Sequence, residues 1–196
     1  MIRATLTALG LAAALALPMT AQESAAPADR MIGPIVGSPA PAGDVVTSDG
    51  TETTLAALAG ENGTAIAFIR SLDWCPYCKK QAIGLEAAKA PLEEAGWSLV
   101  ALSYDDPATL AGFAEDKGLT YTLVSDEGSE VITAYGLLNA DMEEGSRYWG
   151  IPHPAIVFVR TDGTVAAVLR EEGYKDRPEV EVVTETATLL NEASGS

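Results

Sequence analysis

The alternation of apolar and polar positions along the chain predicts an α/β domain. Short apolar runs at 64–69, 97–103 and 155–160 contain many β-branched and aliphatic residues, which indicates buried strands. Residues 75–94 instead carry apolar residues at helical spacing, and Pro107 marks the start of a second helix over 108–117. Gly118 ends the second of these helices, as glycine commonly does. Strands and helices therefore alternate through the middle of the chain.

Shorter elements complete the predicted fold. Two strands around Asp162-Gly163 form an antiparallel hairpin, because this turn is too short for a crossover. The remaining expected elements are short strands at 45–46, 52–54 and 122–124 and helices at 129–135 and 178–191. Alternating strands and helices followed by a hairpin and a last helix predict a central mixed β-sheet with helices on both faces.

The first residues have the pattern of a secretory signal peptide, predicted to be residues 1–21. Arg3 precedes an apolar run from Leu6 to Leu17, which small residues follow. A run of this length is shorter than the roughly 20 apolar residues of a membrane-spanning helix, so we expect no stable membrane anchor. Residues 22–35 read as a flexible lead-in and 36–196 as the folded domain. The expected location is the periplasm.

The charge of the chain narrows the range of partners. Lys and Arg number 12 against 28 Asp and Glu, which gives a formal net charge of -16. This excess of acid argues against nucleic acid or an anionic lipid surface as the main partner. Hydrophobic residues make up 47%, enough for a packed core.

Cys75 and Cys78 are the only cysteines, and three interpretations compete for them. A structural disulfide is disfavoured, because bridging so short a loop constrains the unfolded chain least. A closed zinc site needs four ligands, and the chain adds only His153 to the two thiols. The third interpretation, a reactive dithiol, is the one we favour, and it requires neither a metal nor a cofactor.

The position of the pair supports this chemistry. Cys75 follows a predicted strand and stands where a helix begins, and unpaired N–H groups at that end stabilise a thiolate. Thiol pKa values in Cys-x-x-Cys motifs fall from about 8.5 to roughly 3.5–7.5. Cys78 lies within one helical turn. We therefore expect Cys75 to be the exposed nucleophile and Cys78 the more buried resolving thiol.

The surrounding residues resemble the thioredoxin-like superfamily. The segment Trp74-Cys75-Pro76-Tyr77-Cys78 is similar to the active-site turn of these proteins. Residues 36–41 (VGSPAP) resemble the start of redoxin domains of the alkyl hydroperoxide reductase and thiol-specific antioxidant (AhpC/TSA) type, and residues 150–155 (GIPHPA) resemble their cis-proline segment. The resemblance implies a thioredoxin-like fold over nearly all of the mature chain.

The resemblance also implies roles for individual residues. Pro154 would form a cis bond and present a backbone edge to a substrate chain beside the cysteines. His153 would then lie near the sulfurs and favour a thiolate when cationic. Trp74, Pro76 and Tyr77 would help to position the substrate.

The sequence departs from the patterns of thioredoxins and peroxiredoxins at three positions. The strand before a thioredoxin active site carries a buried acid, and residues 64–69 contain none. Peroxiredoxins place proline and threonine seven and three residues before the peroxidatic cysteine. Counting back from Cys78, which aligns with that cysteine, finds Ser71 and Cys75 instead.

The function expected from the sequence is thiol-disulfide exchange outside the cytoplasm. The Cys75-Cys78 disulfide would exchange with protein dithiols and with a thiol reductant or oxidant. One alternative is a peroxiredoxin-like thiol peroxidase, with a hydroperoxide as substrate. An alternative of another class is a copper-binding module that uses Cys75, Cys78 and His153, because soft thiolates select Cu(I).

Overall fold

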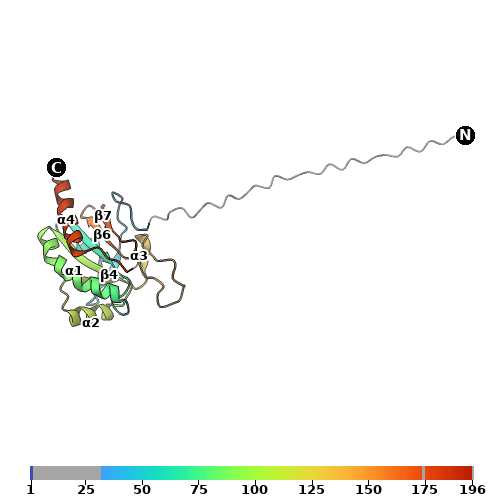
Figure 1. Cartoon of the computed structure of the whole chain (residues 1–196), viewed down its shortest axis with the longest axis horizontal. Coiled ribbons are helices and arrows are strands. Elements are labelled where there is room, and N and C mark those ends of the chain that lie inside the picture. Colours follow the sequence, from blue (N-terminus) through green and yellow to red (C-terminus); the bar gives the residue numbers. More distant parts are fainter. Residues whose placement is uncertain (2–31, 174, 196) are drawn as a thin grey trace. The chain divides into compact units, whose positions relative to one another are not determined.

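The computed structural model describes residues 1, 32–173 and 175–195. Within them, seven strands form one sheet in the order β2-β1-β5-β4-β3-β6-β7 (Figure 1). The strands are β1 (Asp44–Thr47), β2 (Glu52–Thr54), β3 (Gly63–Phe68), β4 (Trp97–Ser103), β5 (Thr122–Ser125), β6 (Ala155–Arg160) and β7 (Val165–Leu169). The helices are η1 (Ala56–Leu58), α1 (Pro76–Glu94), α2 (Pro107–Lys117), α3 (Glu130–Ala134) and α4 (Val180–Ser194).

The centre of the sheet is parallel and its edges are antiparallel. Strands β3, β4 and β5 run parallel, since α1 and α2 return the chain to the same end each time. Strand β6 pairs antiparallel with β3, and β1 pairs antiparallel with β5. The carboxyl ends of β3 and β4 therefore meet at one edge of the sheet. The residues that follow these two strands are brought together there.

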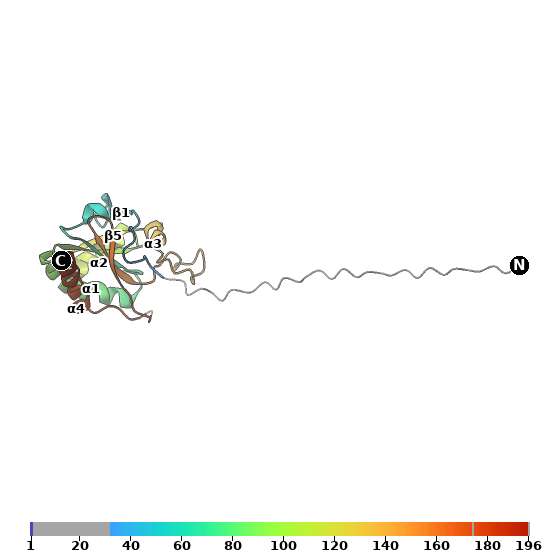
Figure 2. The same cartoon turned by 90° about the horizontal axis from the view of Figure 1, so that it is seen from above.

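Both faces of the sheet are buried, as the continuous apolar runs predicted. Along β3, Ala65 and Ala67 belong to the core on the side of α1, α2 and α4, while Ile66 and Phe68 belong to the core on the side of α3. Figure 2 shows α1 and α4 on one side of the sheet and α3 on the other. Helix α1 packs against β4 and α4, and it carries the cysteine pair at its start.

The mixed sheet with helices on both faces confirms the predicted fold class. Strands β4 and β6 have the predicted bounds, and the remaining elements lie within three residues of theirs. Helix α1 begins at Pro76, so Cys75 is its N-cap residue, and the helix continues through Pro91 to Glu94. Gly118 ends α2 with a left-handed backbone (φ 65°), as predicted.

The N-terminal predictions fall largely outside the described residues. Apart from Met1, this applies to the whole signal peptide predicted at 1–21 and to residues 22–31 of the lead-in. The last lead-in residues are fastened to the domain, because the Gly33 N–H donates to the Gly136 carbonyl at 3.0 Å. No helix within the described ranges is long and apolar enough to cross a bilayer.

Candidate active site

Cys75 caps the first turn of α1 with its sulfur. The residue has an extended backbone (φ -90°, ψ 105°), and its Sγ accepts a hydrogen bond from the Cys78 N–H at 3.3 Å. A serine or aspartate oxygen usually occupies this position. Pro76 follows at the first helical position, where its missing N–H costs nothing. The sequence therefore fixes both the start of the helix and the spacing of the two sulfurs.

Both thiols are buried, which corrects one expectation. Cys75 is 2% exposed and Cys78 is 0% exposed, and the two form no disulfide. The prediction that Cys75 is exposed is therefore wrong, although Cys78 is the more buried of the two. The turn at 71–74 and the apolar core residues around α1 enclose Cys75, since its sulfur folds back over the helix N-terminus.

Three donors converge on the sulfur of Cys78. The Cys75 thiol and the Ser71 backbone N–H hydrogen-bond to it, and Arg177 Nη2 lies 3.5 Å away. Despite burial, these contacts lower the pKa of the Cys78 thiol to about 6, with the Cys75 hydrogen bond as the largest cause. The pKa of Cys75 is raised, first by its hydrogen bond to Cys78 and then by burial.

These contacts favour a different order of the two thiols from the one expected from the sequence. The helix N-terminus favours a negative charge at Cys75, but there it supplies a single N–H contact, from Cys78 at 3.3 Å. Cys78 receives two hydrogen bonds and a full positive charge. A charged donor contributes more than a neutral one, so the arrangement favours the thiolate at Cys78.

Gln81 holds Arg177 in place. Its Oε1 accepts from Arg177 Nε at 2.9 Å, which leaves Nη2 directed at the sulfur. The Arg177 Nη1 group donates to the Asp176 carbonyl at 2.6 Å. Gln81 lies one turn after Cys78 on α1 and is 8% exposed. The pair therefore fastens the segment before α4 to the start of α1.

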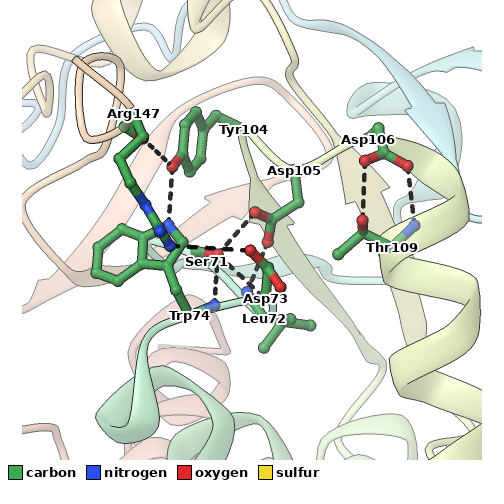
Figure 3. A network of polar contacts seen from close by, with 9 residues as sticks. All are labelled: Ser71, Leu72, Asp73, Trp74, Tyr104, Asp105, Asp106, Thr109 and Arg147. Carbon is green, nitrogen blue, oxygen red and sulfur yellow. Dashed lines mark hydrogen bonds and ion pairs between the residues drawn. The ribbon is translucent and has the colours of Figure 1, made fainter.

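Asp105 anchors the turn that precedes the cysteines (Figure 3). It lies two residues after the end of β4 and is buried. Its carboxylate accepts from the Ser71 hydroxyl at 2.8 Å and from the Leu72 N–H at 2.6 Å. The Ser103 hydroxyl donates to it as well, at 2.9 Å. Burial raises the pKa of Asp105, and these hydrogen bonds counteract the rise. A buried acid thus lies behind the active-site turn, supplied by β4 rather than by β3.

Trp74 links the same turn to the long loop before β6. Its Nε1 donates to the Tyr104 hydroxyl at 2.9 Å, and that hydroxyl donates to the Arg147 carbonyl at 2.6 Å (Figure 3). The Tyr148 ring meets the Trp74 ring edge-on, with centroids 4.8 Å apart. Trp74 therefore has a packing role here. Tyr77 is partly exposed, and the Lys175 ammonium lies 5.9 Å from its ring centroid.

The predicted cis-proline site is not found. The described residues contain no cis peptide bond, so the His153–Pro154 bond is trans and that prediction is wrong. No hydrogen bond between described residues joins either residue to a cysteine; both line a separate cavity of about 270 Å³ with Arg70 and Arg170. Burial and then Arg170 lower the pKa of His153, so a cationic imidazole is disfavoured. The backbone of His153 is instead used in the fold, donating to the Leu137 carbonyl at 2.7 Å.

The ligand set of the copper alternative is not assembled. Within residues 32–173 and 175–195, no group of three or more His, Cys, Asp or Glu side chains is arranged to hold a metal ion. His153 lines the cavity it shares with Arg70 and Arg170, which neither cysteine lines, so the two thiols lack their third ligand.

Sequence reasoning missed three residues of the site. Arg177 and Gln81 carry no motif, and only the fold brings the first of them to Cys78. Asp105 had a signal, since an acid shortly after a buried strand lies at the edge where the neighbouring strand also ends. Parallel pairing of β3 and β4 places the residues after both strands at the same edge of the sheet, so the position of Asp105 after β4 was this signal.

The fold and the site define a thioredoxin-fold oxidoreductase built around a Cys-x-x-Cys pair. Residues 36–168 match the model of the AhpC/TSA family. The chain belongs to this family, which confirms the resemblance.

Relatives and solved structures agree with this assignment. The chain is 30% identical over 141 residues to the putative peroxiredoxin bcp of Haemophilus influenzae, covering 72% of this chain and 89% of the relative. It is 30% identical over 132 residues to peroxiredoxin Bcp of Escherichia coli, covering 67% and 83%. The crystal structure of peroxidoxin BcpB from Mycobacterium tuberculosis superposes with a TM-score of 0.66 at 21% identity, covering 83% of this chain and 97% of that one.

Proposed function

We propose that the protein is a thiol peroxidase in which Cys78 attacks the peroxide and Cys75 resolves the product. The Cys78 thiolate attacks one oxygen of the O–O bond, giving a sulfenic acid at Cys78 and releasing an alcohol or water once a proton is supplied. The Cys75 thiol then displaces the hydroxyl as water and forms the Cys75–Cys78 disulfide. A dithiol donor reduces this disulfide and completes the cycle.

One observation carries the proposal: the cation and the two neutral donors around the Cys78 sulfur. A thiol with a pKa of about 6 is mostly ionised at pH 7, and the thiolate is the reactive form. The same donors can stabilise negative charge that develops on the peroxide as its O–O bond breaks. The similarity to peroxiredoxins supports peroxide as the electrophile.

A cavity beside Arg177 offers a route to the sulfur. Its volume is about 670 Å³, and it lies between α1 and the segment that leads into α4. Gln81 and Arg177, which bracket Cys78, line it together with Tyr77. Neither cysteine lines the cavity and Cys78 is fully buried, so a peroxide that enters here must pass Gln81 and Arg177 to reach the sulfur.

Peroxide consumption with dithiothreitol as electron donor tests the proposal. We expect the wild type to turn over hydrogen peroxide and Cys78→Ser to be inactive. Cys75→Ser should be oxidised once, leaving a sulfenic acid at Cys78 that dimedone traps. The proposal fails if Cys75→Ser protein gives no adduct at Cys78 while the Cys78→Ser variant forms one at Cys75.

Thiol-disulfide exchange with proteins is the second candidate. It is favoured by Cys75, which stands where the peroxiredoxin pattern places a threonine and makes the pair a Cys-Pro-Tyr-Cys motif. Reduction of insulin disulfides by the reduced protein, without peroxide turnover, would select this function. In that case mixed disulfides should accumulate on whichever cysteine is the nucleophile when the other is changed to serine.

We also propose that the protein acts outside the cytoplasm, in the periplasm. The support is the Arg3 start and the apolar run from Leu6 to Leu17. The mature N-terminus should then fall between residues 20 and 28 in protein recovered from the periplasm. Full-length protein beginning at Met1 in the cytoplasm would refute this location and leave the chemistry of the cysteine pair unaffected.

A further inference from the structure

The hydroxyl of Ser71 is fully used within the active-site turn. It donates to the Asp105 carboxylate at 2.8 Å and accepts from the backbone N–H groups of Asp73 at 3.0 Å and Trp74 at 3.3 Å (Figure 3). Its donor and both of its acceptor positions are thus occupied. Ser71 is 0% exposed, so water cannot replace any of these bonds. The hydroxyl fixes the turn in one conformation.

The side chain of Asp105 is surrounded by hydrogen-bond donors. The Ser71 hydroxyl, the Leu72 N–H and the Ser103 hydroxyl all point their hydrogens at it. A carboxylate accepts all three, whereas an amide of the same shape would turn an NH₂ group toward a donor. Leaving a buried donor unpaired is costly, so this position demands an ionised acid. The carboxylate therefore connects the end of β4 to two consecutive residues after β3.

The turn in question supplies one of the donors at Cys78. The backbone N–H of Ser71 is one of the groups that lower the pKa of Cys78, while the Ser71 side chain is tied to Asp105. The other groups facing that sulfur are the Cys75 thiol from the helix start and Arg177 from the segment before α4. Asp105 hydrogen-bonds to Ser71, Leu72 and Ser103 and, within the described residues, to neither cysteine. The turn is therefore the path of hydrogen bonds from Asp105 to the thiol.

We propose that Asp105 and Ser71 are a positioning pair for the proposed Cys78 nucleophile, holding the turn so that the Ser71 N–H faces the sulfur. This role rests on the proposed function, because the pair would position a group that stabilises the Cys78 thiolate. The pair touches no substrate.

The direction in which Asp105→Asn shifts the pKa of Cys78 separates a positioning role from a direct effect of the carboxylate charge. A nearby carboxylate disfavours a thiolate, so removing its charge would lower the pKa of Cys78 if Asp105 acted through its field. If Asp105 acts by holding the turn, its loss misplaces the Ser71 N–H and raises that pKa. Asp105→Asn therefore shifts the pKa in opposite directions under the two explanations.

The experiment is the pH dependence of iodoacetamide alkylation of Cys78 in the reduced full-length protein, read by mass spectrometry. We expect Asp105→Asn and Ser71→Ala each to raise the pKa of Cys78 by about 1, lowering the alkylation rate at pH 6 roughly fivefold. The double variant should shift the pKa no further, because both residues act through one turn. Asp106→Asn is the matched control, since this neighbouring acid caps α2 through Thr109 and does not contact the turn.

Several results would overturn the proposal. A lower pKa in Asp105→Asn would assign Asp105 a field effect, and additive shifts in the double variant would mean that the two residues act independently. An unchanged pKa in folded Ser71→Ala would remove the turn from the mechanism, and this uncharged change decides the matter if Asp105→Asn does not fold. The pKa is measured without peroxide, so absence of peroxidase activity would refute the proposed function and leave this test intact.

Discussion

The guanidinium of Arg177 lies 3.5 Å from the sulfur of Cys78, although 99 residues separate them in the sequence. Arg177 belongs to the segment between β7 and α4, and Cys78 to the first turn of α1. The packing of α4 beside α1, seen in Figure 1, brings that segment to the cysteine. Arg177 hydrogen-bonds to Cys78 and, within the described residues, no arginine hydrogen-bonds to Cys75, although the charge of Arg177 also lowers the pKa of Cys75.

Removing the charge of Arg177 should return Cys78 toward an ordinary thiol. With a pKa of about 6 the thiol is mostly ionised at pH 7, whereas a thiol at about 8.5 is ionised to a few per cent. We expect Arg177→Gln to raise the pKa of Cys78 by about 1, which lowers its alkylation rate at pH 7 about twofold and moves its pH midpoint upward. Arg147→Gln is the control, since Arg147 packs on Trp74 and does not contact the sulfurs. Equal profiles for both variants would contradict the role of Arg177.

The Cys75 thiol should act as a hydrogen-bond donor to the Cys78 thiolate. Its hydrogen bond is the largest cause of the lowered pKa of Cys78. We therefore expect Cys75→Ala to raise that pKa, and Cys75→Ser, whose hydroxyl can still donate, to raise it less. Thiolate absorbance at 240 nm across a pH titration of the reduced variants measures both values. A larger rise in the serine variant than in the alanine variant would contradict this account.

Gln81 should hold Arg177 beside Cys78 while lowering the free energy of unfolding. Its Oε1 holds Arg177, but its buried Nε2 has no hydrogen-bond partner among the described residues. An unpaired buried donor costs about 1–3 kcal/mol. Gln81→Met should therefore leave the free energy of unfolding unchanged or raise it, while moving the pKa of Cys78 upward by less than Arg177→Gln does. Urea unfolding and the alkylation profile check the two parts separately, and a loss of stability with an unchanged pKa would contradict both.

Gly63 should tolerate no side chain. It lies at the start of β3 with φ at 139°, and a Cβ there would come within 2.8 Å of the Trp97 ring and 2.9 Å of the Arg160 Cα. We expect Gly63→Ala to lower the free energy of unfolding by about 3 kcal/mol or more. Gly112→Ala, in α2 with open space around it, should instead raise it by roughly 0.5–1 kcal/mol. Thermal or urea unfolding of the two variants provides the comparison.

Local sequence predicted most of the fold. Buried strands such as β4 and β6 are continuous apolar runs, and helices such as α2 begin at proline and end at glycine. Cys75 and Cys78 could also be placed, because their spacing and the start of α1 are local properties. The sequence did not predict the proposed order, with Cys78 as the nucleophile, because the helix start by itself favours a thiolate at Cys75.

The sequence by itself determined the elements, the thioredoxin-like class and the cysteine pair. Only the tertiary structure decided which sulfur receives the positive charge, that Asp105 lies behind the turn, and that His153 and Pro154 lie in another cavity with a trans bond between them. The physical reason is range. Backbone preferences and helix capping act over a few residues, whereas the field of Arg177 and the bond from Asp105 act through space between segments that the chain alone does not bring together.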